Sequence, residues 1–70
     1  MIEFQCLVTD YYHGRIDAVA SELNARVDYF RGFMNVLAII RDGEYIGCVW
    51  VLGKDFVALR KAVLEVLNVD

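Results

Sequence analysis

The period of the apolar residues changes along the chain and predicts distinct elements. Residues Ile2–Thr9 alternate between apolar and mostly polar side chains, which is typical of a half-buried strand. From His13 to Arg31 the apolar residues recur at helical spacing in one stripe. Gly32 follows directly and suits the left-handed residue that ends a helix. We therefore expect a strand over residues 2–9 and an amphipathic helix over residues 13–31.

Two apolar runs, Phe33–Arg41 and Glu44–Leu52, follow the helix and are rich in Val, Ile and aromatic residues. Asp42 and Gly43 join them. Asp-Gly between two such runs predicts a hairpin with a type I′ turn, because both turn residues need positive φ. The runs are therefore expected to be neighbouring antiparallel strands.

A second helix is predicted over Phe56–Asn68, with Asp55 as its N-cap. The order β-α-β-β-α predicts a single α+β domain over residues 1–70, with two helices on one face of a three-stranded antiparallel sheet. This is the ferredoxin-like arrangement without its last strand, and its strand order is 1-3-2. The first strand then lies at an unpaired edge, which is a candidate docking site. Its outward residues are Glu3, Gln5, Leu7 and Thr9.

A regular two-residue turn pairs Arg41 with Glu44 and decides which hairpin side chains share a face. The face expected to pack against the helices carries Met34, Val36, Ala38, Ile40, Tyr45, Gly47, Val49 and Val51. The other face is also apolar, and the chain has no spare segment to cover it. This predicted interface consists of Phe33, Asn35, Leu37, Ile39, Ile46, Cys48, Trp50 and Leu52.

Composition strengthens the expectation of a partner. Of the 70 residues, 59% are hydrophobic, which is a high share. A domain of this size buries only about 60% of the surface that its unfolded chain exposes, so its own core is thin. An uncovered apolar face would be around or above the size of the largest patch that a typical soluble monomer tolerates. We expect a homodimer or binding to a larger protein, as in a small inhibitor or adaptor. Two dimer geometries are open: first strands paired edge to edge, or sheets stacked face to face.

Charge and chemistry exclude several classes of function. Seven basic residues against ten acidic ones, with no basic run, argue against nucleic acid as a partner. No apolar run approaches the roughly 20 residues of a membrane helix, and the start lacks the positive charge of a signal peptide. The two cysteines lie in apolar segments, so we expect buried reduced thiols and a cytoplasmic protein. The single histidine and the lack of a catalytic or ligand-binding spacing predict no enzyme, metal or cofactor.

One irregular segment between the first strand and the first helix combines aromatic and polar residues. Backbone N–H groups at a helix N-terminus favour anions, and tyrosine and arginine are common at the centres of interfaces. The segment is therefore a candidate loop for a ligand or a partner, although its residues would equally serve to pack the end of the sheet. They are Asp10, Tyr11, Tyr12, His13 and Arg15.

A strand ending in Asp10, followed by Gly14, an amphipathic helix and a hairpin, resembles the ACT regulatory domain. That family consists of small dimeric amino-acid sensors. The resemblance implies an alternative function for this chain, a small-ligand sensor that uses the loop from Asp10 to Arg15.

Overall fold

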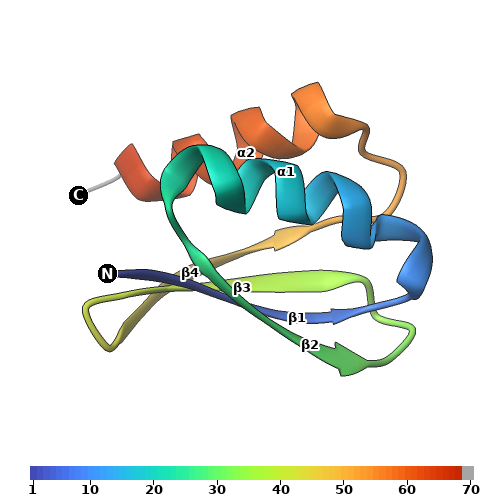
Figure 1. Cartoon of the computed structure of the whole chain (residues 1–70), viewed down its shortest axis with the longest axis horizontal. Helices are drawn as coiled ribbons and strands as arrows, with labels where there is room; N and C mark the ends of the chain where they lie inside the picture. Colours follow the sequence, from blue (N-terminus) through green and yellow to red (C-terminus); the bar gives the residue numbers. More distant parts are fainter. Residues whose placement is uncertain (69–70) are drawn as a thin grey trace.

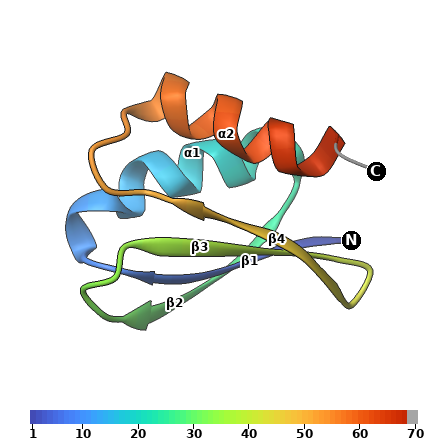
Figure 2. The ribbon, with the colours of Figure 1, turned by 180° about the vertical axis from the view of Figure 1, so that it is seen from behind.

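The structure, a computed structural model, describes residues 1–68 as one four-stranded sheet with two helices on the same face (Figures 1 and 2). This arrangement confirms the α+β class. The strands are β1 (Ile2–Val8), β2 (Arg26–Arg31), β3 (Val36–Arg41) and β4 (Glu44–Trp50). The short 3-10 turn η1 (Asp10–Tyr12) leads into helix α1 (His13–Leu23), and helix α2 (Phe56–Asn68) follows β4.

The order of strands in the sheet is β2-β1-β3-β4. Strand β1 pairs in parallel with β2 and antiparallel with β3, and β3 pairs antiparallel with β4. The predicted three-stranded sheet with order 1-3-2 is therefore wrong. The edges are β2 and β4, so the edge proposed for Glu3, Gln5, Leu7 and Thr9 does not exist.

The additional strand arises because helix α1 is shorter than predicted. Asn24 adopts the left-handed conformation, with φ of 53°, and its N–H closes the last turn on backbone carbonyls of α1. Asn tolerates this conformation better than most residues, so it ends the helix in place of Gly32. The residues of β2 then alternate, with Val27 and Tyr29 packed against the core and Phe30 exposed.

The hairpin turn forms as predicted. Asp42 and Gly43 have φ of 53° and 82°, and Arg41 pairs with Glu44. These positive φ values are what a type I′ turn requires. The prediction of the turn is confirmed.

A β-bulge next to the turn changes the faces of β3. Ile40 pairs with Tyr45, but Ile39 pairs with Gly47, so Ile46 is the extra residue. Beyond the bulge the pairing is displaced by one residue relative to a regular hairpin, which exchanges inward and outward positions. Leu37 and Ile39 are fully buried as a result. Their predicted place on the uncovered face is wrong.

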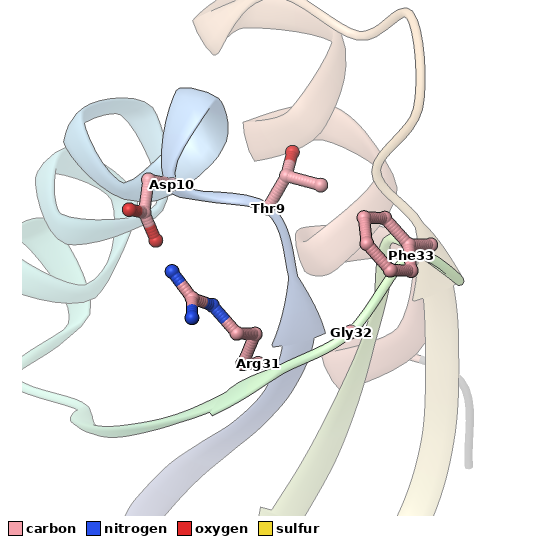
Figure 3. Close-up of a pocket in the computed structure, with 5 residues that line it drawn as sticks. All are labelled: Thr9, Asp10, Arg31, Gly32 and Phe33. Atoms are coloured by element: carbon pink, nitrogen blue, oxygen red, sulfur yellow. The ribbon is translucent and has the colours of Figure 1, made fainter.

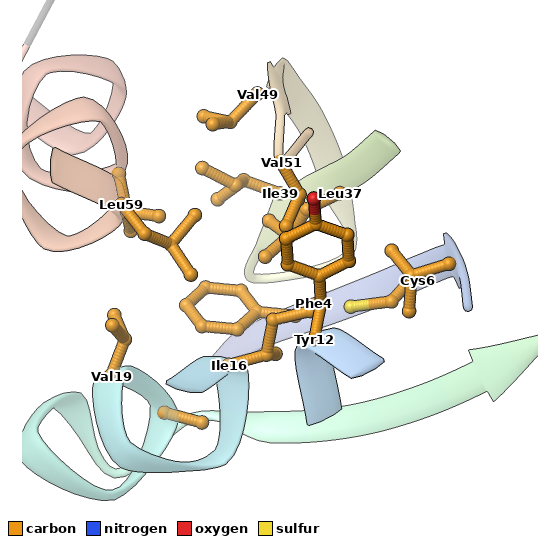
Figure 4. Packing of buried hydrophobic residues seen from close by; sticks show 13 residues of the cluster. Phe4, Cys6, Tyr12, Ile16, Val19, Leu37, Ile39, Val49, Val51 and Leu59 are labelled. Carbon is orange, nitrogen blue, oxygen red and sulfur yellow. The ribbon is translucent and has the colours of Figure 1, made fainter. Parts of the chain in front are cut away.

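The core lies between the sheet and the two helices (Figure 4). Each layer contributes fully or nearly fully buried apolar side chains, among them Phe4, Cys6 and Val8 of β1, Ile16 and Val19 of α1, and Leu59 and Val63 of α2. Helix α2 has the predicted bounds, and the backbone N–H of Ala58 donates to the Asp55 carboxylate at 2.8 Å, which confirms the N-cap.

Candidate functional site

The sheet face opposite the helices, here called the open face, is covered by no other element among residues 1–68 (Figures 1 and 2). The strand register arranges its side chains in rows that cross the sheet. One row consists entirely of apolar residues and is here called the apolar row. From β2 to β4 it runs Phe30, Leu7, Val36, Trp50.

The two ends of the apolar row are the most exposed. Trp50 is 57% and Phe30 54% exposed, whereas Leu7 and Val36 between them are half-buried. Leu7 lies over the backbone of Gly32, because a Cβ added to that glycine would approach the Leu7 Cγ to 2.5 Å. The exposed loop residues beyond the row are Phe33, Met34 and Leu52. This end of the open face therefore presents a continuous apolar surface.

The remaining rows divide the open face into two halves. On β1 and β2 the next positions are Gln5 and Asp28, followed by Glu3 and Arg26. On β3 and β4 the corresponding positions are mostly apolar: Ala38 and Cys48, followed by Ile40 and Tyr45. The apolar surface thus extends down one half of the sheet only.

The predicted interface residues separate into three groups. Cys48 and Trp50 lie on the open face, and Phe33 and Leu52 lie on the exposed loops beside it. Leu37 and Ile39 belong to the core, and Ile46 is half-buried against it. Asn35 is buried in the loop before β3, where it binds Thr9. The predicted burial of the thiols is confirmed for Cys6, which is buried, and is wrong for Cys48, which is exposed.

The sequence pattern placed two members of the apolar row elsewhere: Val36 on the hairpin face expected to pack against the helices, and Phe30 in the apolar stripe of the helix predicted over residues 13–31. Phe30 fits helical spacing after Val27, and this fit concealed the strand. The signal for β2 was Asn24 followed by the alternation around Val27 and Tyr29. The bulge that turns Val36 toward the open face has one signal in the sequence, Gly47. A glycine inside a strand often marks a bulge or a close approach of the backbone to another segment.

The loop from Asp10 to Arg15 holds the start of α1 against the segment between β4 and α2. The backbone N–H of Gly53 donates to the buried Tyr12 hydroxyl at 3.0 Å. The Arg15 guanidinium donates to the carbonyl oxygen of Lys54 at 2.7 Å and lies over the Tyr11 and Tyr12 rings, 4.8 and 4.9 Å from their centroids. Tyr12 and Arg15 therefore pack the end of the sheet, while Tyr11 remains exposed.

His13 is held by β2 and is not free in a cleft. Its ring stacks on Tyr29, with the centroids 3.7 Å apart. The Tyr29 hydroxyl donates to Asp17 at 2.6 Å and also contacts the His13 carbonyl oxygen. Burial, followed by the bond to Asp17, raises the pKa of Tyr29, so this phenol is a neutral donor.

A pocket of about 330 Å³ lies where the parallel strands β1 and β2 end. In sheets with parallel strands, ligands bind beyond the carboxyl ends of such strands. Figure 3 shows the Asp10 carboxylate and the Arg31 guanidinium pointing toward one another, although they form no salt bridge. Thr9, Gly32 and Phe33 complete the lining. The arrangement offers one negative and one positive group to a ligand, beside an aromatic ring.

Of the two thiols, the buried Cys6 is unsuited to nucleophilic chemistry. Burial, with smaller contributions from the charges of Asp17 and Asp28, raises the pKa of the Cys6 thiol to about 12. The thiol is therefore protonated at neutral pH and is a poor nucleophile. These residues contain no cluster of three His, Cys, Asp or Glu side chains placed to hold a metal ion.

Within the described part of the chain, neither helix has the length and apolar character needed to cross a membrane. No family model, curated protein or solved structure matches this sequence. The open face and the pocket between Asp10 and Arg31 are therefore the two features that carry a functional inference.

Proposed function

We propose that this chain is a non-enzymatic protein-interaction module that binds through the apolar end of its open face, with a second copy of the chain as its partner. The observation that carries the proposal is the apolar row, which crosses all four strands. Both of its ends are more than half exposed. Both helices already pack against the other face of the same sheet, so neither is available to cover the open face.

The size of the surface supports association. The largest apolar patch on a typical monomer is roughly 300–600 Å². If each of two copies buries about 400 Å² of such surface, the gross gain is about 20 kcal/mol at 25 cal/mol per Å². Association costs about 4–15 kcal/mol in lost freedom and ordering. The balance favours a dimer.

The non-enzymatic part of the proposal is supported by the state of His13 and Cys6 and by the place of the exposed Cys48, which lies on the open face, across the sheet from His13. His13 stacks on Tyr29, and the Cys6 thiol is fully buried. His13 and Cys6 both contribute to packing and neither lines the pocket, although His13 Nε2 lies 3.7 Å from the Asp10 carboxylate at its edge.

Light scattering of the purified protein across a dilution series tests the proposal. We expect a dimer for the natural chain and a monomer for Trp50→Glu, because a buried carboxylate would replace an apolar contact. The matched control is Tyr45→Glu, on the same strand and face but at the far end, which should remain dimeric. A natural chain that is monomeric at every concentration would overturn the proposal, as would a Trp50→Glu variant that dimerises normally.

The pocket supports a second candidate function, the binding of a small zwitterion. Asp10 would face an ammonium group and Arg31 a carboxylate, with Phe33 beside an apolar substituent. The sheet order differs from the ferredoxin-like arrangement, so this candidate is supported by the pocket and not by the resemblance to the ACT domain.

Thermal unfolding with phenylalanine as the probe tests the second candidate. A bound ligand raises the melting temperature, and a probe at 100 times its dissociation constant adds about 2.7 kcal/mol. Phenethylamine and 3-phenylpropionate each lack one charge and should give smaller shifts, and Arg31→Gln should abolish the shift. The control variant is Arg26→Gln at the other end of β2. Equal shifts for all three compounds, or no shift for phenylalanine, would contradict this candidate.

A further inference from the structure

We infer that His13 determines which class of ligand the pocket between Asp10 and Arg31 takes: a zwitterion while its imidazole is neutral, and a carboxylate without an ammonium group once it is protonated. This inference rests on the second candidate function, the binding of a small ligand in that pocket. The observation that carries it is the contact of His13 with Asp10, in which Nε2 lies 3.7 Å from a carboxylate oxygen.

The Asp10 carboxylate has a cation on one side and a titratable group on the other. Figure 3 shows it pointing toward the guanidinium of Arg31, with which it forms no salt bridge. Arg31 is a permanent cation. His13 does not line the pocket but approaches Asp10 beside it. The charge that a ligand meets at Asp10 therefore depends on the protonation of His13.

The position of the imidazole ring is fixed by its neighbours. It stacks on Tyr29 with the centroids 3.7 Å apart, and the Tyr29 hydroxyl donates to Asp17 at 2.6 Å. The side chain is 33% exposed, so water reaches it. The carboxylates beside the ring are Asp10 of η1 and Asp17 of α1. Tyr29 of β2 and Cys6 of β1 stay neutral between pH 5 and 8, because burial raises the pKa of each.

Protonation of His13 changes the charge that the pocket presents. A neutral imidazole leaves the Asp10 carboxylate to the ammonium group of a ligand. An imidazolium forms an ion pair with that carboxylate, which cancels its negative charge and leaves the positive charge of Arg31. The ammonium group of a ligand then meets no net negative charge, whereas a carboxylate still meets Arg31. The pocket therefore prefers phenylalanine when His13 is neutral and 3-phenylpropionate when it is protonated.

The composition of the chain assigns this dependence to one side chain. His13 is the only histidine, and unperturbed carboxylates stay ionised between pH 5 and 8. An α-amino group also titrates in this range. That of Met1 is bound to Asp42 next to the start of β1, whereas the pocket lies beyond the end of this strand.

Titration calorimetry with phenylalanine and with 3-phenylpropionate, at about pH 5.5 and about pH 8, tests the inference. We expect phenylalanine to bind about three- to fivefold less tightly at the lower pH, the size of an exposed ion pair, and the preference between the two compounds to reverse. His13→Gln keeps a planar polar side chain that does not titrate, and it should show the same preference at both pH values. Asp42→Asn, the control that alters the surroundings of the Met1 ammonium, should keep the reversal.

Proton exchange on binding gives a second measurement, which needs no variant. A ligand and a proton affect each other's binding reciprocally. At about pH 6.5 phenylalanine should therefore release a fraction of a proton, and 3-phenylpropionate should take one up. Titrations in two buffers that differ in their enthalpy of ionisation measure the sign.

The outcomes separate this inference from the candidate function on which it rests. The same sign of proton exchange for both compounds would overturn the inference, as would a His13→Gln variant in which the preference still reverses. Phenylalanine that binds with an affinity independent of pH, or 3-phenylpropionate that fails to bind at the lower pH, would overturn it while leaving the second candidate function intact. A chain that binds phenylalanine at no pH would overturn both.

Discussion

The side-chain oxygen of Asn35 accepts a hydrogen bond from the backbone N–H of Thr9 at 2.9 Å, and this bond joins the end of β1 to the start of β3. The Asn35 carbonyl oxygen accepts a second bond from Val51, at 2.7 Å, after the end of β4. Asn35 itself has a positive φ of 51°. One buried residue therefore fixes three strands at the end of the sheet that carries the apolar row.

We expect Asn35→Ala to lower the free energy of unfolding by about 2–3 kcal/mol. The Thr9 N–H would lose its partner, and alanine is strained at positive φ. Asn35→Gly removes the same amide without that strain and should cost less. Urea unfolding of the three proteins measures the order. Equal losses for the two variants would show that the backbone conformation contributes nothing.

A second prediction concerns the contact of α2 with β4. A Cβ added to Gly47 would lie 2.9 Å from a methyl group of Val66, which is stiff at χ1. Gly47→Ala should therefore destabilise the protein by about 1–3 kcal/mol through overpacking. Val66→Ala removes the methyl groups, so the double variant should lose less than the sum of the single losses. Strict additivity in denaturant unfolding would contradict the clash.

A third prediction concerns alkaline pH. The pKa of Cys6 is about 12 in the folded protein and 9.0 in the absence of its surroundings. Between these values the unfolded chain loses the thiol proton and the folded chain keeps it. Stability due to this group is therefore complete below about pH 9 and falls as the pH rises toward 12, by at most about 1.4 kcal/mol per pH unit.

The matched variant for this prediction is Cys6→Ala. It loses some packing at all pH values, but its free energy of unfolding should decline less steeply above pH 9. Tyr29 remains in both proteins, and because burial and Asp17 are the main causes of its raised pKa, with Cys6 the smallest, its contribution to the slope is nearly the same in each. Parallel curves for the two proteins between pH 9 and 11 would contradict the prediction.

A fourth prediction concerns the Arg15 guanidinium, which joins the start of α1 to the loop before α2. Arg15→Ala should cost about 1–2 kcal/mol, because the bond to Lys54 and the contacts with the Tyr11 and Tyr12 rings are lost together. Arg15→Lys should restore little, since an ammonium lacks the planar group that lies over the rings. Arg26→Ala, an exposed control, should change stability by less than about 0.5 kcal/mol. Full recovery by lysine, measured by thermal unfolding, would contradict the role of the planar group.

The elements with strong local signals were predictable from the sequence. The Asp42-Gly43 turn and the helix Phe56–Asn68 with its Asp55 cap follow from residues that are neighbours in the chain. The boundary at Asn24 was misjudged because Val27 and Phe30 satisfy helical spacing and strand alternation within the same few residues. The local pattern therefore fits both a helix and a strand, and the pairing with β1 determines that these residues form a strand.

The candidate site was less predictable, because its composition depends on contacts between distant segments. An apolar open face was expected from the sequence, but the bulge at Ile46 decides that Val36 faces outward and Leu37 inward. The apolar row further requires β1 to lie between β2 and β3. Its residues are separated by up to 43 positions in the chain, from Leu7 to Trp50, so no periodicity within one segment reveals it.

The central place of β1 also has a consequence for how the chain folds. Both neighbours of this strand follow it in the sequence, one in parallel after a helix and the other antiparallel after a further loop. The hairpin of β3 and β4 can close locally, but it cannot assemble the sheet without the strand at the opposite end of the chain. During synthesis on a ribosome the first apolar segment therefore emerges before either of its neighbours, and we expect the closing of long loops to limit the folding rate.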